Sequence, residues 1–91
     1  MANYFISYDL MNQKNYPRVE AQIQAVDPSA LRVLFSLWYV KSQSTQEQVY
    51  NSVVRALDND DKLLVITSST AIAEKSRLGP VWDATLKRWN S

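Results

Sequence analysis

The sequence contains no cysteine and no histidine. Without cysteine, the chain has no disulfide framework, no thiol nucleophile and no thiolate metal site. Without histidine, it lacks the usual zinc ligands, Ser-His catalysis and histidine-mediated proton transfer. Any catalysis must therefore use carboxylates, lysines, tyrosines or hydroxyl groups, alone or with a metal ion that prefers oxygen ligands.

Other scarce features bound the class of protein. No apolar stretch reaches membrane-spanning length and no basic leader precedes one, so we expect a cytoplasmic protein. The net charge of +1 is far from the strongly basic balance that is typical of nucleic-acid-binding domains. A chain of 91 residues supports one thin core, and we treat residues 1–91 as a single domain. Its ten aromatic residues favour a homodimer, because so small a core leaves apolar area for a partner.

Apolar periodicity predicts a strand, a helix, an extended segment, a second helix and a last strand within a core of residues 3–67. Residues 4–8 alternate between two faces as in a β-strand, and Asp9 follows at the C-terminal tip of that strand. Pro17 suits the first turn of the first helix, and the second helix begins at a Ser-Thr-Gln-Glu capping box at residues 44–47.

The extended segment at residues 31–41 has two interpretations. Its run of β-branched, aromatic and aliphatic side chains is typical of a buried strand. A four-stranded sheet would need two antiparallel strands here, yet no Gly, Pro or Asn marks a hairpin, and Ser36 is the only plausible bend. One long strand and two strands joined by a sharp bend both remain open.

Residues 68–91 form a C-terminal tail, in which Trp82, Leu86 and Trp89 recur at the spacing of a short packing helix. The order of elements predicts the α+β class and a ferredoxin-like βαββαβ sandwich, with an antiparallel sheet and two helices on one of its faces. The other face is left open. We expect a second copy of the chain or the aromatic tail to cover it.

Three segments resemble the small nuclease subunit of CRISPR adaptation complexes, whose relatives include virulence-associated ribonuclease toxins and poorly characterised bacterial and phage proteins. Residues 4–10 (Tyr-Phe-Ile-Ser-Tyr-Asp-Leu) resemble the first strand of that family. Residues 36–38 (Ser-Leu-Trp) resemble its central Ser-Val-aromatic step, and residues 60–66 are similar to its acidic turn and last core strand. The resemblance covers residues 3–67 and implies a dimeric ferredoxin-like protein.

The resemblance also implies a site at the end of the first strand. In the family, the aspartate there faces its twin across the dimer axis, and the pair holds a divalent metal ion that activates water against a phosphodiester. Carried over, the catalytic and metal-binding residue is Asp9, the metal is Mg²⁺, and Tyr8 and Ser36 give polar support. Two close carboxylates need a cation between them, and Mg²⁺ accepts hard oxygen ligands. The alternative is that Asp9 only caps the following loop.

Few basic residues are available for nucleic acid. The family's loop after the first strand is often rich in arginine, whereas this sequence offers Lys14 and Arg18, to which we add Arg32. Affinity for nucleic acid grows with each phosphate neutralised, so we expect weak binding of duplexes or none. The aspartates within residues 58–61 lack the glycine and distal glutamate of a calcium loop, and we interpret them as a solvated turn.

Three functions follow as hypotheses. The first is a homodimer that associates with nucleic acid and has weak or no nuclease activity. The second is an active Mg²⁺-dependent endonuclease similar to the ribonuclease toxins. The third is a phage or plasmid regulator or inhibitor that binds a host protein complex. Adaptation subunits usually add a strand that crosses to the partner subunit, whereas this chain has a helical tail, so the resemblance leaves the mode of dimerisation open.

Overall fold

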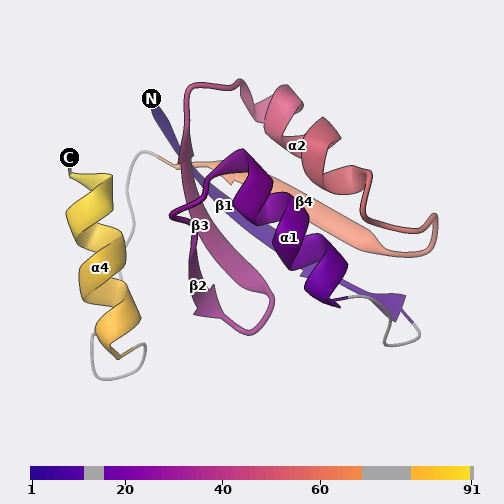
Figure 1. Ribbon diagram of the computed structural model, residues 1–91, viewed down its shortest axis with the longest axis horizontal. Helices are drawn as coiled ribbons and strands as arrows, with labels where there is room; N and C mark the ends of the chain where they lie inside the picture. The colour runs from indigo at the N-terminus through magenta and orange to yellow at the C-terminus, as the bar shows by residue number, and fades with distance from the viewer. Residues whose placement is uncertain (12–15, 69–78, 91) are drawn as a thin grey trace.

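The computed structural model describes residues 1–11, 16–68 and 79–90. In these ranges the elements follow one another as in Figure 1: β1 (Ala2–Asp9), α1 (Tyr16–Val26), β2 (Leu31–Leu34), β3 (Leu37–Ser42), α2 (Gln46–Val54), β4 (Lys62–Thr67) and α4 (Pro80–Trp89). The strands form one four-stranded antiparallel sheet in the order β2-β3-β1-β4. The predicted α+β class with an antiparallel sheet is confirmed. Within the described ranges, no helix has the length and apolar character needed to cross a membrane.

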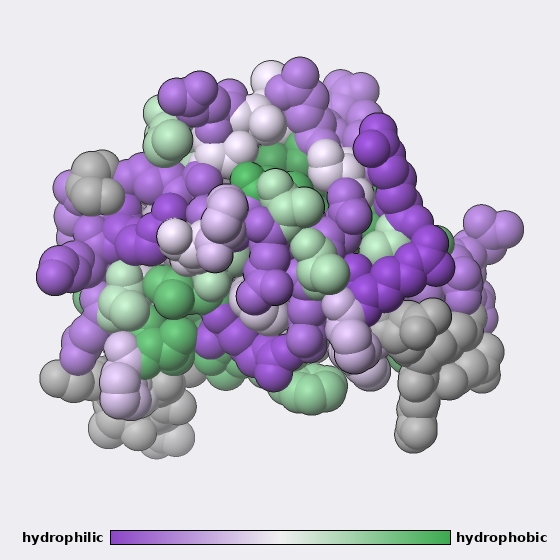
Figure 2. Space-filling view, in the orientation of Figure 1, coloured by the Kyte–Doolittle hydropathy of each residue, from purple (hydrophilic) through white to green (hydrophobic). Residues whose placement is uncertain are grey.

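α1 and α2 cover one face of the sheet. Tyr4, Ile6 and Tyr8 alternate along β1 and are almost fully buried toward these helices. The helices complete this main core with short branched side chains, Val19, Ile23, Val49 and Val53. In the orientation of Figure 1 the surface is mostly hydrophilic, with apolar residues confined to small patches (Figure 2). Both helices therefore bury an apolar stripe and leave polar side chains in solvent.

α4 packs on the opposite face of the sheet, over β2 and β3 (Figure 1). Its Trp82 forms a second buried cluster with Val33 and Tyr39. Its Trp89 ring lies 6.4 Å from the Tyr39 ring, centroid to centroid. The predicted tail helix is present, and it covers the part of the open face that belongs to β2 and β3.

The β4 half of the same face is not covered by α4 within the described ranges. Leu64 and Ile66 pair with Ser7 and Phe5 of β1, so these four side chains share one face of the sheet. Leu64 is 57% exposed and Ile66 is 45% exposed. Proteins usually pair or shield an apolar edge strand, because it otherwise invites association.

Residues 31–41 form two strands, which decides between the two interpretations of that segment. A tight turn at Phe35 and Ser36 joins β2 to β3, and Leu34 pairs with Leu37 across it. The pairing register shifts within β2, as a bulge would require. Short hairpin turns favour Gly and Asn, which supply unusual backbone angles at little cost. A Phe-Ser turn therefore gives no hairpin signal in the sequence.

Two helix details differ from prediction by one residue. The capping box of α2 begins at Thr45 rather than Ser44, because the Thr45 hydroxyl accepts from the backbone N–H of Gln48. In α4 the fully buried residue is Thr85, whereas Leu86 is exposed. The Thr85 hydroxyl donates to a backbone carbonyl one turn earlier, which satisfies it without a partner outside the helix.

A partly buried ion pair ties α4 to Asp27, the residue that follows α1. Arg88 Nη1 donates to the Asp27 carboxylate at 2.6 Å, and this carboxylate also accepts from the backbone N–H groups of Ser29 and Lys41. Lys41 Nζ in turn donates to the carbonyl oxygen of Arg88 at 2.8 Å. Burial alone would raise the pKa of Asp27, but the Arg88 guanidinium and the two N–H groups outweigh it and hold that pKa below its ordinary value.

Candidate functional site

The antiparallel register gathers three chain segments at the C-terminal end of β1. Asp9 pairs with Lys62 at the start of β4. Tyr8 donates its backbone N–H to the carbonyl oxygen of Ser36 at 3.2 Å, which fixes the β2-β3 turn beside the end of β1. The sheet thereby brings together residues that lie far apart in the sequence.

An open hollow of about 300 Å³ lies at this end of the sheet. Its lining consists of residues from β1, the β2-β3 turn and β4: Ser7, Tyr8, Asp9, Ser36, Lys62, Leu63 and Leu64. Two of the predicted site residues, Asp9 and Ser36, therefore face one hollow. Asp9 is exposed, and Ser7 and Ser36 are partly buried. The hollow offers one carboxylate and two serines to a molecule that enters it.

Lys62 is a residue of this site that sequence reasoning missed. It is the direct cross-strand neighbour of Asp9, and opposite charges at such positions attract. A lysine beside Asp9 weakens the affinity of a single carboxylate for Mg²⁺ by Coulomb repulsion. One copy of the hollow is therefore a poor magnesium site, and a second carboxylate would be needed. The lysine was visible in the sequence, but its register with Asp9 was not.

Tyr8 borders the hollow, but its side chain belongs to the main core on the other face of the sheet. Its hydroxyl accepts a hydrogen bond from Trp38 Nε1 at 3.0 Å. Burial raises the pKa of Tyr8, and the Trp38 hydrogen bond opposes only part of that increase. The residue is held as a neutral phenol in the core, on the opposite face from Asp9.

The two described arginines that were predicted to contact nucleic acid do not lie around Asp9. Arg18 lies on α1 and donates to the backbone carbonyl of Arg55 at 3.2 Å. Arg32 lies on β2 and forms an ion pair with Glu20 of α1. Both arginines are therefore on the side of α1, whereas Lys14 lies outside the described residues.

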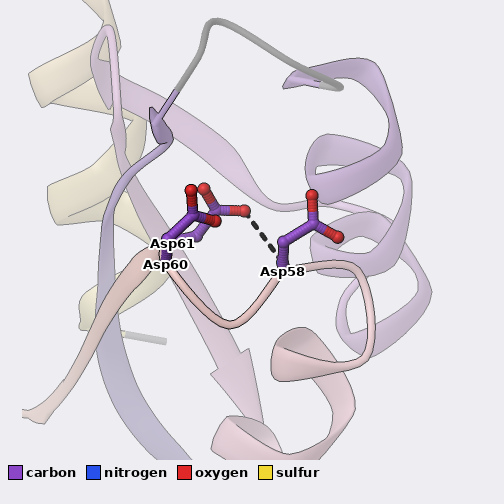
Figure 3. A group of neighbouring side chains, drawn as sticks. All are labelled: Asp58, Asp60 and Asp61. Atoms are coloured by element: carbon purple, nitrogen blue, oxygen red, sulfur yellow. Dashed lines mark hydrogen bonds between the residues drawn. The ribbon is translucent and has the colours of Figure 1, made fainter.

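A second acidic group lies in the turn before β4. Asp58, Asp60 and Asp61 place carboxylate oxygens within 4.8 Å of one another, and this geometry could hold a cation (Figure 3). The Asp61 carboxylate, however, accepts from the backbone N–H groups of Met11 and Asp58, each at 2.9 Å. It therefore already serves to close the turn and to tie it to the end of β1.

The tip of the β2-β3 hairpin carries aromatic residues that the sequence interpretation did not select. The Phe35 ring lies 5.1 Å from the ring of Tyr16, centroid to centroid. The guanidinium carbon of Arg32 lies 5.8 Å from the centroid of the Phe35 ring. A phenylalanine in a turn is unusual and could have pointed to this cluster. The sequence, however, did not establish that Phe35 lies in a turn.

The comparison with known proteins does not identify a family or a function for this chain. The likeness of residues 3–67 to the adaptation nuclease subunit therefore stays a prediction. What the chain can do must follow from its own residues. Family models, curated proteins and solved structures were all compared with the chain, and none of them matches it.

Proposed function

We propose that this protein is a homodimer that associates with nucleic acid, with weak or no nuclease activity of its own. The proposal includes a ferredoxin-like sandwich, which the element order βαββαβ and the strand order β2-β3-β1-β4 support. It also follows the resemblance of residues 3–67 to the small adaptation nuclease subunit. A fold alone does not determine function, so the site has to carry the proposal.

The proposal rests on one observation: the hollow that contains Asp9 adjoins an exposed apolar surface of β4 that no described element covers. Leu64 lines the hollow and is also 57% exposed on that surface. A second copy placed on this surface would shield Leu64 and Ile66 from water, which is worth about 1.5–3 kcal/mol for each side chain fully buried. The same contact would bring the two copies of Asp9 close to a shared axis.

Paired Asp9 carboxylates would give the dimer a site for Mg²⁺ that one chain lacks. The oxygens of both carboxylates fit a hard cation, and bound Mg²⁺ lowers the pKa of water and neutralises phosphate charge. Lys62 beside each Asp9 favours a phosphate oxygen over a metal ion in the same hollow. For this reason we place association with nucleic acid above cleavage.

The second candidate is a Mg²⁺-dependent endonuclease. It is favoured by the exposure of Asp9, which leaves the carboxylate accessible to a metal ion and a substrate. Ser7 and Ser36 would then orient water or a phosphate oxygen through their hydroxyl groups, and Asp9 is the one carboxylate among the described lining residues of the hollow.

Cleavage and binding by Asp9→Asn separate the two candidates. Labelled single-stranded and duplex DNA and RNA are incubated with the protein in Mg²⁺ and in EDTA, and binding is measured by fluorescence anisotropy. We expect wild type and Asp9→Asn to bind equally well and to leave the strands intact. The matched control is Glu47→Gln, which changes an exposed carboxylate on the first turn of α2.

Mg²⁺-dependent cleavage that disappears in Asp9→Asn and persists in Glu47→Gln would move the assignment to the endonuclease. If the wild-type protein bound none of the strands, both candidates would be wrong.

A further inference from the structure

We infer that the tip of the β2-β3 hairpin is a stacking platform for an unpaired base of single-stranded nucleic acid. The platform consists of Phe35 in the turn, Tyr16 at the start of α1 and Arg32 in β2. The inference rests on the proposed association with nucleic acid, and it names the surface and the form of the strand.

The exposure of Phe35 is the first argument. Phe35 is 67% exposed and belongs to neither buried cluster of the described residues. Its neighbour Leu34 is 51% exposed. Side chains this exposed contribute little to folding, and a turn gains nothing from a phenylalanine. An apolar ring in this position is suited to contact with something outside the chain.

The second argument is that the ring is held in place. Phe35 and Tyr16 meet at an interplanar angle of 52°, with their centroids 5.1 Å apart. Tyr16 in turn lies 6.0 Å from the buried ring of Tyr8. A tilted contact with one neighbour restrains Phe35 but occupies only part of its surface. A base that stacks on the ring therefore pays little of the ordering cost that a mobile side chain would impose.

The third argument is the cation beside the ring. The Arg32 guanidinium carbon lies 5.2 Å from the centroid of Trp38 and 5.8 Å from that of Phe35. Glu20 fixes it by an ion pair, and the Arg32 side chain stays 41% exposed. A guanidinium has five N–H donors, more than one carboxylate uses, so Arg32 can also reach a phosphate. Aromatic rings next to a cation are the usual means of binding single strands.

The platform is continuous with the hollow at the end of β1. Ser36 follows Phe35 in the turn and lines the hollow together with Asp9. The platform itself lies on the α1 side of the sheet, whereas Asp9 lies on the other face, so a base on Phe35 would place the strand at the turn that borders both. Bases in a duplex are already stacked on their neighbours, so the platform suits an unpaired base and stays consistent with the weak duplex binding expected from the charge balance.

Substitution of Phe35 tests the inference. The probe is a short single-stranded oligonucleotide, DNA or RNA, with 2-aminopurine at one position, whose fluorescence falls when the base stacks. We expect wild type to quench the probe and Phe35→Ala to weaken binding by about 5- to 100-fold, the range that corresponds to loss of one base–aromatic stack. Phe35→Trp should keep affinity and quenching, whereas Phe35→Leu should lose both.

The matched control is Tyr50→Ala, which removes an exposed aromatic side chain from α2 and should leave the affinity unchanged. Equal affinity of wild type and Phe35→Ala would overturn the inference and leave the proposed function standing. An effect of Phe35→Ala on oligomeric state instead of strand affinity would also overturn it. If wild type bound no strand at all, the inference and the proposed function would fail together.

Discussion

At the scale of single residues, the ion pair between Asp27 and Arg88 is the most consequential polar contact. Asp27 is buried, and Arg88 Nη1 lies 2.6 Å from its carboxylate. The same guanidinium lies 5.8 Å from the centroid of the Tyr39 ring. The Asp27 side chain is 6% exposed and that of Arg88 is 29% exposed, so loss of this partly buried pair should cost more than loss of a pair on the surface.

We expect Asp27→Asn to lower the free energy of unfolding by about 2 kcal/mol at neutral pH, because the charge-assisted bond to Arg88 is lost. The pKa of Asp27 is lower in the folded protein than in the unfolded chain. Its charge therefore stabilises the fold above the unfolded pKa, and this contribution is lost as the pH falls toward the folded pKa. The difference between wild type and Asp27→Asn should then shrink below about pH 4.

Urea denaturation at several pH values measures this difference. Asp9→Asn makes the same chemical change at an exposed position and should alter stability by no more than about 0.5 kcal/mol. A gap between wild type and Asp27→Asn that stayed constant from neutral to acid pH would show that the charge of Asp27 contributes nothing.

At the scale of elements, the β2-β3 turn has Phe35 and Ser36 at positions where short hairpin turns favour Asn and Gly, and it exposes the Phe35 ring. Replacing both turn residues, Phe35→Asn with Ser36→Gly, supplies the pair that two-residue hairpins favour. We expect the free energy of unfolding to rise by about 0.5–1 kcal/mol, as turn optimisation commonly achieves, while affinity for the single strand falls. Thermal or urea denaturation checks the first effect. Lower stability would mean that the Phe35–Tyr16 contact outweighs the backbone gain.

The sequence predicted those elements whose signals are local. Pro17 marked the start of α1, and the capping box predicted from Ser44 and Glu47 placed the start of α2 to within one residue of the observed Thr45–Gln48 box. The alternation of β1 placed Asp9 at the end of its strand. The sequence left open whether residues 31–41 form one strand or two, because Ser36 is a weak turn signal and Phe35 is none; the pairing of β2 with β3 shows two strands.

The arrangement of the candidate site could be predicted from the sequence less well than the fold. That Lys62 faces Asp9 depends on the register between β1 and β4, which no local pattern encodes. That Arg32 turns toward Glu20 and α1 depends on how the helix packs against the sheet. Residue type therefore indicated which side chains could bind a ligand or take part in chemistry, but not which of these side chains lie next to one another in the fold.

At the scale of the whole molecule, the sheet is covered fully on one face and partly on the other. α1 and α2 share the first face, while α4 covers β2 and β3 on the second (Figure 1). Among the described residues, no element covers the edge strand β4 on the second face, where Leu64 and Ile66 are exposed. Such an edge is suited to a second copy of the chain, because each copy hides the apolar surface of the other.

We expect the wild-type protein to be a dimer and Leu64→Lys to raise the dimer dissociation constant at least about tenfold, since a charge would replace an apolar contact. Sedimentation velocity over a range of concentrations measures the constant. The matched control, Val54→Lys, changes an exposed residue of α2 and should have no effect. A wild-type protein that stayed monomeric at every concentration would contradict the proposed dimer.

The position of Met1 next to Trp89 has a practical consequence for handling the protein. Met1 and Trp89 line a common hollow of about 490 Å³, so the first and last described segments lie side by side. Asp9 lies at the far end of β1, about 23 Å from Ala2 along a strand of eight residues. A surface linkage made close to Met1 therefore attaches at the end of β1 that is remote from Asp9, and leaves Asp9 accessible to an oligonucleotide in immobilised assays.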